Sequence, residues 1–228
     1  MTLRGLGRYH PFVKLLPLGD QAVLTYHADE AAAVGFAAAV RAAGFPWLQD
    51  VVPAYASAGV FFDADRAGLA QVMEALQALR LEGGSAAVGQ LHRIACCYEM
   101  QLDLARVAEH TGLTPEMVIA NHTAIEYAVY AIGFCPGFPY LGYLPPALLG
   151  VPRLSAPRLR VEPGSVGLTG KQTGIYPLAR PGGWNLIGRT PLVLVDLQDN
   201  YFPIAVGDRV RFERIDEVEY RRLKGERL

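Results

Sequence analysis

The chain has little cysteine, almost no net charge and no long apolar run. Its 228 residues include three cysteines, too few for a disulfide framework, so we expect reduced thiols. With 21 Lys and Arg residues against 22 Asp and Glu residues, no basic field favours nucleic-acid binding. No apolar run reaches about 18 residues, the length of a membrane-spanning helix. Residues 1–10 also lack the apolar core of a signal peptide, so a cytoplasmic protein without membrane contact is predicted.

Hydrophobic residues make up 51% of the chain, enough to bury a core in one large domain or two small ones. Residues 1–86 predict a small α+β domain with two helices against a sheet. Asp29 is suited to cap an Ala-rich helix that Gly44 ends, and Asp63 or Asp65 to start a second helix. Strands are expected in residues 13–26 on both sides of a turn at Gly19-Asp20, and in residues 51–55 and 58–62.

The Gly-Gly-Ser segment at residues 82–85 predicts a linker to a second, mainly β domain, residues 87–228. Asp103 is expected to cap a short helix that Gly112 ends, and Thr114-Pro115 to open another. The charged end of the chain, residues 217–228, is expected to fray. Many turns between short strands favour a closed or half-closed barrel. Strand-like runs occupy residues 91–98, 127–134, 192–196 and 208–213.

The stretch from residue 133 to residue 184 is the richest in information. Gly and Pro recur every few residues, which excludes a long helix. Interleaved Phe, Tyr, Trp, Leu and Ile side chains favour burial over disorder. We therefore expect a tightly turned β surface that carries aromatic and Arg side chains on rigid loops, which suits a binding site. Residues 164–171 suggest a phosphate loop only superficially, because Ser165 and Gln172 stand where the motif needs Gly and Ser or Thr.

Several side chains in the second domain have two possible roles. His122 is either an exposed or capping residue, or a general acid or base. No second His or Cys lies at metal-ligand spacing from it, so zinc is not expected and no metal site is predicted. Cys135 shows no base nearby in sequence, so a packed thiol is the better interpretation. Trp184 either fills the barrel or forms a pocket wall. Three arginines can either form surface ion pairs or bind a carboxylate, namely Arg153, Arg158 and Arg189.

The motifs of this chain, taken in order, resemble those of the bacterial 5-oxoprolinase B-subunit family, also called the KipI-type kinase inhibitor or allophanate hydrolase subunit 1 family. Residues 133–141 read Gly-Phe-Cys-Pro-Gly-Phe-Pro-Tyr-Leu. The resemblance covers almost the whole chain, although Glu99 and Leu102 stand where the family usually has Gly and Pro. Further matching motifs are Leu18-Gly19-Asp20, Pro152-Arg153, Pro157-Arg158, Gly164-Ser165-Val166, Gln172-Thr173-Gly174-Ile175-Tyr176-Pro177, Pro181-Gly182-Gly183-Trp184, Ile187-Gly188-Arg189-Thr190-Pro191 and Gly207-Asp208-Arg209.

The resemblance implies an N-terminal α+β domain followed by a cyclophilin-like β-barrel. It implies a hydrolase subunit, inactive alone, in an ATP-dependent complex with 5-oxoprolinase subunits A and C (a KipA-type partner) that opens 5-oxoproline to glutamate. Since no nucleotide motif is visible, ATP is expected to bind mainly on a partner subunit and no cofactor on this chain alone. The alternatives are a module that inhibits a sensor histidine kinase and a component of a biotin-dependent urea carboxylase system.

For the enzyme subunit, we expect a barrel cleft that binds the small cyclic amide at a subunit interface. His122 is the candidate for proton transfer. His122, Arg158, Gln172 and Trp184 are expected to line one pocket whose rim is formed by residues 133–143. The full set of expected substrate contacts is Arg153, Arg158 or Arg189 for the carboxylate, Gln172 and Thr173 as polar contacts, and Phe138, Tyr140, Tyr176 and Trp184 as walls.

Overall fold

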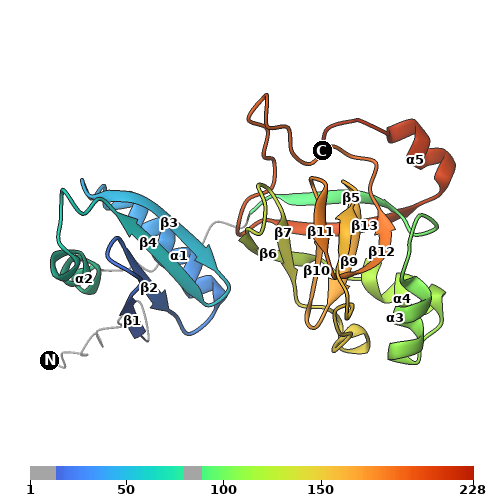
Figure 1. The fold of residues 1–228 in the computed structure, drawn as a ribbon, viewed down its shortest axis with the longest axis horizontal. Helices are drawn as coiled ribbons and strands as arrows, with labels where there is room; N and C mark the ends of the chain where they lie inside the picture. Colours follow the sequence, from blue (N-terminus) through green and yellow to red (C-terminus); the bar gives the residue numbers. More distant parts are fainter. Residues whose placement is uncertain (1–13, 80–88) are drawn as a thin grey trace, which may run out of the picture. The chain divides into compact units, whose positions relative to one another are not determined.

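The computed structural model describes residues 14–79 and 89–228 (Figure 1). The chain divides into two compact units, Met1–Ala87 and Val88–Leu228, each with its own core. The linker predicted at residues 82–85 lies outside the described residues. In the described part, no helix has both the length and the apolar character needed to cross a membrane.

The first unit is a four-stranded antiparallel sheet with the strand order β1-β2-β4-β3. Apolar residues alternate along its strands, so that Val23 of β2 and Val60 of β4, which are paired in register, both lie in the core. The strands are β1 (Lys14–Pro17), β2 (Ala22–Tyr26), β3 (Leu48–Ala54) and β4 (Ser57–Phe62).

Helix α1 (Glu30–Ala42) packs on β3 and β4 through the buried residues Phe36 and Val40. The predicted cap is present, because the Asp29 carboxylate accepts a hydrogen bond of 2.8 Å from the backbone N–H of Ala32. Gly44, with φ of +62°, follows the helix as expected.

The predicted start of the second helix is wrong, because α2 (Leu69–Ala78) begins after Gly68. Asp63 instead accepts a hydrogen bond from the N–H of Asp65 and forms an ion pair with Arg66. An Asp that bonds its own backbone two residues on makes a turn that competes with helix initiation.

The second unit is a closed barrel of seven strands within residues 89–228, in the order β10-β7-β6-β13-β5-β12-β9. Strands β5 and β13 are parallel, and the other neighbours are antiparallel. The barrel strands are β5 (Leu91–Cys97), β6 (Tyr127–Ile132), β7 (Pro139–Gly142), β9 (Ser165–Thr169), β10 (Gln172–Ile175), β12 (Asn185–Arg189) and β13 (Arg209–Ile215). A separate two-stranded ribbon consists of β8 (Arg158–Val161) and β11 (Arg180–Gly182).

Helices α3 (Leu104–Thr111) and α4 (Pro115–Thr123) pack against each other (Figure 1). Both helices contribute apolar side chains to the barrel core. Gly112, with φ of +69°, ends α3, and the Thr114 hydroxyl caps α4, both as predicted. Asp103 precedes α3 but makes no side-chain cap, because its carboxylate accepts hydrogen bonds from Arg158 and from the N–H of Leu186. Gln101 takes its place and accepts from the N–H of Leu104. The single-turn helix η1 (Pro146–Leu148) follows β7.

Two predictions for the end of the chain are wrong. Residues 192–196 form no strand and make only isolated bridges from Val193 to Arg227 and from Asp196 to Tyr201. The charged tail does not fray, because α5 (Glu217–Leu223) forms after an Asp216 cap. Arg227 then pairs with Asp196, and Leu228 packs against the main core, so tertiary contacts order a segment that its composition alone leaves open.

The observed architecture confirms the predicted fold class, a small α+β unit followed by a mainly β barrel. A buried pair joins the first barrel strand to the start of the last one, because His92 Nε2 in β5 lies 2.9 Å from Oδ2 of Asp208, the residue before β13. The same carboxylate accepts hydrogen bonds from the backbone N–H groups of Gln90 and Ala205. Asp208 therefore serves three donors from the first and last parts of the barrel.

Removal of this carboxylate should destabilise the second unit. We expect Asp208→Ala to lower its free energy of unfolding by about 3 kcal/mol, because buried donors lose their acceptor. Urea unfolding, followed by Trp184 fluorescence in a Trp47→Phe background, measures the effect. The matched control is Glu213→Ala in the same strand, which breaks an exposed ion pair with Arg93 and should cost less than about 1 kcal/mol. Equal losses for the two variants would contradict the assignment.

Candidate functional site

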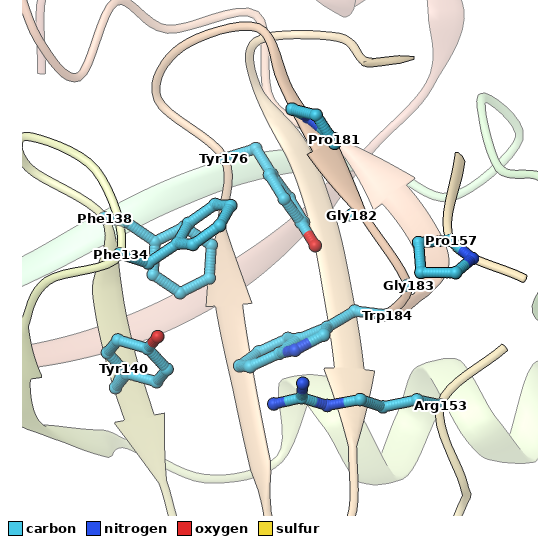
Figure 2. Close-up of a pocket in the computed structure, with 10 residues that line it drawn as sticks. All are labelled: Phe134, Phe138, Tyr140, Arg153, Pro157, Tyr176, Pro181, Gly182, Gly183 and Trp184. Atoms are coloured by element: carbon cyan, nitrogen blue, oxygen red, sulfur yellow. The ribbon is translucent and has the colours of Figure 1, made fainter. Parts of the chain in front are cut away.

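A pocket of about 260 Å³ lies on the outer side of the barrel, between β7, β10 and the β8–β11 ribbon (Figure 2). Its wall is mostly aromatic, with one cationic side chain. The lining residues are Phe134, Phe138, Tyr140, Arg153, Pro157, Tyr176, Pro181, Gly182, Gly183 and Trp184.

The aromatic walls pack edge to face around Phe138. Its ring centroid lies 5.1 Å from that of Tyr176 and 5.4 Å from that of Trp184, both nearly perpendicular to it. This is the favoured geometry for aromatic pairs. Gly174 makes the packing possible, since a Cβ there would lie 2.9 Å from the Phe138 ring and 3.0 Å from the Trp184 ring. The two rings can meet only over a residue without a side chain.

Phe134 forms the exposed rim of the pocket. It is 57% exposed, and its φ of +66° is rare for a bulky residue. A tight turn holds it there, through hydrogen bonds from Cys135 N to Gly133 O and from Phe138 N to Cys135 O. Strained residues of this kind are concentrated at binding sites. Phe134 lay in the stretch that the sequence singled out but was not among the expected wall residues.

Two donors in the pocket have no hydrogen-bond partner among the described residues, the Arg153 guanidinium and the Tyr140 hydroxyl. Figure 2 shows the guanidinium alongside the Trp184 ring, and the Tyr140 and Tyr176 hydroxyls directed into the pocket. Burial raises the pKa of Tyr140, and burial also raises the pKa of Tyr176. Both phenols are therefore protonated at neutral pH and able to donate hydrogen bonds.

A layer of buried polar contacts fixes the pocket from behind. The Asn185 amide donates to the carbonyl groups of Pro152 and Leu168, and its oxygen accepts from Arg106. Pro152 precedes Arg153, and Asn185 follows Trp184. The fully hydrogen-bonded side chain of Asn185 therefore holds the Arg153 loop next to the strand that follows Trp184.

Arg158 does not line the pocket. Its Nη2 lies 2.7 Å from the Asp103 carboxylate, in a partly buried ion pair that anchors the start of the β8–β11 ribbon to α3. Arg189 also lies outside this pocket, and its Nε donates to the carbonyl of Pro163. Gln172 pairs with Gly142 and Thr169 within the barrel wall. Of the three candidate arginines, the structure places Arg153 alone among the pocket residues.

His122 lies in the last turn of α4 and is fully buried, away from the pocket walls. Its Nδ1 lies 2.7 Å from the Tyr98 hydroxyl and its Nε2 2.9 Å from the Thr173 hydroxyl, which in turn donates to the carbonyl of Gly167. Burial lowers the pKa of His122 to about 3. An imidazole with that pKa is a weak base at neutral pH, so its surroundings favour a structural role, and proton transfer stays a prediction.

Of the four residues expected to share one pocket, only Trp184 lines it. Five of the expected contacts do meet there, namely Phe138, Tyr140, Arg153, Tyr176 and Trp184. Cys135 packs behind them, and burial raises the pKa of its thiol, as expected for an unreactive cysteine. In residues 14–79 and 89–228, no cluster of three or more His, Cys, Asp or Glu side chains could hold a metal ion.

Comparison with known proteins agrees with this architecture. Residues 13–204 match the family described as carboxyltransferase domain, subdomain C and D. The chain is 38% identical over 206 residues to the 5-oxoprolinase B subunit of Bacillus subtilis strain 168, covering 83% of this chain and 85% of the relative. It is 54% identical over 111 residues to the 5-oxoprolinase B subunit of Escherichia coli O157:H7, covering 48% of this chain and 50% of the relative.

Solved structures show the same fold. The crystal structure of TTHA0988 has a TM-score of 0.76 at 36% identity over 86% of this chain, and this chain spans only 40% of its length. The uncharacterized protein PH0987 from Pyrococcus horikoshii has a TM-score of 0.55 at 35% identity, over 91% of this chain and 100% of that one. The Kluyveromyces lactis urea carboxylase has a TM-score of 0.71 at 15% identity, over 93% of this chain and 24% of that one, which shows the fold alone.

An α+β unit followed by a closed mixed barrel, with a matching family pattern over most of its length, defines a protein of the carboxyltransferase-domain class. Within that class the resemblance seen in the motifs is confirmed. The chain belongs to the 5-oxoprolinase B-subunit family.

The burial of His122 predicts a pH dependence of stability. Its folded pKa of about 3 lies below the ordinary value of 6.5, so below pH 6.5 the unfolded chain binds a proton that the folded chain does not. His122 should therefore lower stability as the pH falls from 6.5 towards 3, by up to about 1.4 kcal/mol per pH unit. Imidazole ¹⁵N NMR of the folded chain provides the direct check, with the His122 ring remaining neutral at pH 5. Titration of this ring near pH 6.5 would contradict the prediction.

The aromatic packing predicts a second effect. Gly174→Ala should displace the Trp184 ring and destabilise the second unit by about 1–3 kcal/mol, because the new methyl group has no room. Trp184 fluorescence in a Trp47→Phe background reports both changes. Gly133→Ala is the control, since its Cβ would meet only the Tyr140 ring at an ordinary 3.8 Å. If the two variants behave alike, Gly174 does not set the pocket wall.

Proposed function

We propose that this chain is the B subunit of an ATP-dependent 5-oxoprolinase complex and that its aromatic pocket binds 5-oxoproline. The observation that carries the proposal is the pocket itself, with one unpaired Arg153 guanidinium among aromatic walls of the described residues. 5-Oxoproline is a flat five-membered lactam with one carboxylate. A planar ring suits the walls of Phe138 and Trp184, and a carboxylate suits the fork of a guanidinium.

The polar groups of the pocket correspond to those of the ligand. Arg153 binds the carboxylate, and the protonated Tyr140 hydroxyl donates to the lactam carbonyl. Asn185 holds the Arg153 loop against the Trp184 strand, so that little ordering is needed when the ligand binds. The contribution of this chain is thus to bind and orient the lactam, and the residues that line its pocket include no group suited to act as a nucleophile.

The remaining parts of the reaction belong to other subunits in this proposal. The phosphate-loop-like segment of the sequence ends in the β9–β10 hairpin, where Gln172 pairs with Thr169. ATP therefore binds mainly on a partner, and the lactam is activated where the aromatic pocket faces that partner. Subunits A and C, the latter of the KipA type, are the proposed partners. Arg158 and Arg189 do not bind the lactam in this proposal, because Arg158 pairs with Asp103 and Arg189 donates to the carbonyl of Pro163 outside the aromatic pocket.

The proposal is tested by reconstitution of this chain with 5-oxoprolinase subunits A and C. Arg153→Gln should raise the KM for 5-oxoproline about 10- to 100-fold with little change in kcat, since it removes a charge-assisted hydrogen bond to the bound carboxylate. ATP-dependent glutamate formation is the readout. The isolated chain should show no turnover.

Arg221→Gln is the matched control, because Arg221 is an exposed arginine of the same unit that pairs with Glu217 on α5. Unchanged kinetics are expected for it. Normal KM in Arg153→Gln, or robust turnover by the isolated chain, would overturn the proposal. An inhibitor of a histidine kinase would instead act on the kinase without subunits A and C, which an autophosphorylation assay with the isolated chain detects.

A further inference from the structure

A second pocket, of about 340 Å³, lies on the outer face of the barrel, at the other end of strand β8. Its residues come from the loop before α3 and from β8, β9 and β12. They are Met100, Gln101, Leu102, Arg160, Val161, Glu162, Ser165, Leu186, Gly188 and Arg189. None of them lines the aromatic pocket.

Strand geometry brings the hydroxyl of Ser165 to this pocket. Along β9, Val166 and Leu168 lie in the barrel core, so the alternating residues Ser165 and Gly167 face outward. Ser165 is only 6% exposed and lines the pocket, yet its hydroxyl has no hydrogen-bond partner in the described part of the chain. The Ser165 oxygen is not among the buried polar atoms that lack a partner in the described residues, so it is reached from the pocket and is free to bond a ligand there.

Two further donors face the same space without a full set of acceptors. The Gln101 side-chain oxygen accepts from the N–H of Leu104, which leaves its NH₂ group without a partner among residues 14–79 and 89–228. Arg189 uses its Nε for the carbonyl of Pro163, and no described residue accepts from its two terminal nitrogens. The carboxylate among the lining residues, Glu162, is already bound by both Nε and Nη2 of Arg160. The pocket therefore has an excess of donors and one net positive charge.

The rest of the wall is apolar, formed by Met100, Leu102, Val161 and Leu186. A ligand that satisfies both parts carries an anionic acceptor at one end and a short aliphatic body at the other. We propose that this second pocket is a binding site for a small aliphatic carboxylate, held by Arg189, Gln101 and Ser165. The site is separate from the aromatic pocket, and the inference does not depend on the function proposed for that pocket.

The two pockets share structural elements. Val161 lines the second pocket and packs in the cluster of Phe138, Tyr176 and Trp184 behind the first. Strand β11, which pairs with β8, ends in Gly182 of the first pocket. A carboxylate bound in the second pocket thus contacts the same ribbon that forms a wall of the first.

Butyrate is the test probe, with butyramide as the neutral analogue of the same shape. Two-dimensional ¹H–¹⁵N NMR of the full chain follows the backbone amides of Leu102, Ser165 and Gly188. Butyrate should shift them saturably with a dissociation constant on the order of millimolar, and butyramide should not. The titration is repeated in Arg153→Gln, where any binding in the aromatic pocket through Arg153 is removed and these shifts should persist.

Variants of the second pocket complete the test. Arg189→Gln should weaken butyrate binding about tenfold or more, as expected for a lost charge-assisted bond. Leu102 is 68% exposed, so its variants should fold normally. Leu102→Glu should weaken binding and Leu102→Lys should retain it. The proposal is overturned if butyramide binds equally well, if shifts appear only at Tyr176, Gly182 and Trp184, or if the charge variants at Leu102 do not differ.

Discussion

The parallel pairing of β5 with β13 is the constraint on which the second unit depends. It joins residues from Leu91↔Arg209 to Cys97↔Ile215, so the first and last strands of the barrel lie side by side. The chain between these two strands therefore forms one long closed loop. The conformational entropy lost on closing this loop has to be offset by contacts that form together. The buried His92–Asp208 pair stands at the start of this seam, and its carboxylate accepts from backbone groups of both ends.

The aromatic pocket can form because glycines stand where its aromatic rings come closest to the backbone. Gly174 lets Phe138 and Trp184 meet, and a Cβ at Gly182 would lie 2.4 Å from the Tyr176 hydroxyl. Behind these rings, side chains of α3 and of the residue before it form hydrogen bonds with β12, the strand that begins at Asn185. Asp103 accepts from the N–H of Leu186, and Arg106 donates to Asn185. The early helix of the unit thus sets the geometry of a site made by later strands.

The two pockets have the same electrostatic character, although they share no lining residue. In each, an arginine and a hydroxyl have no full set of acceptors among the described residues, while the carboxylates nearby, Asp103 and Glu162, are already paired with other arginines. A guanidinium with N–H groups left to donate, beside apolar walls, favours an anion with a hydrophobic body. The ribbon of β8 and β11 contributes to both walls.

The local features were determined by the sequence itself. The Asp29 and Thr114 caps, the Gly112 stop and the strands on both sides of the Gly-Pro-rich stretch depend on neighbours a few residues away. The order of motifs was enough to identify the family, and the aromatic character of residues 133–184 was enough to find the pocket region. At these three positions the partners are local, and prediction and structure agree.

Tertiary structure alone decided the partners of several other polar side chains. Asp103 was expected to cap a helix but serves Arg158 and Leu186, which lie 55 and 83 residues away. His122 was expected at the cleft but is buried between Tyr98 and Thr173. The tail was expected to fray but is held by Asp196 and the main core. Burial and long-range hydrogen bonds fix these roles, and neither is encoded in residue type or spacing, because both arise only when the barrel closes.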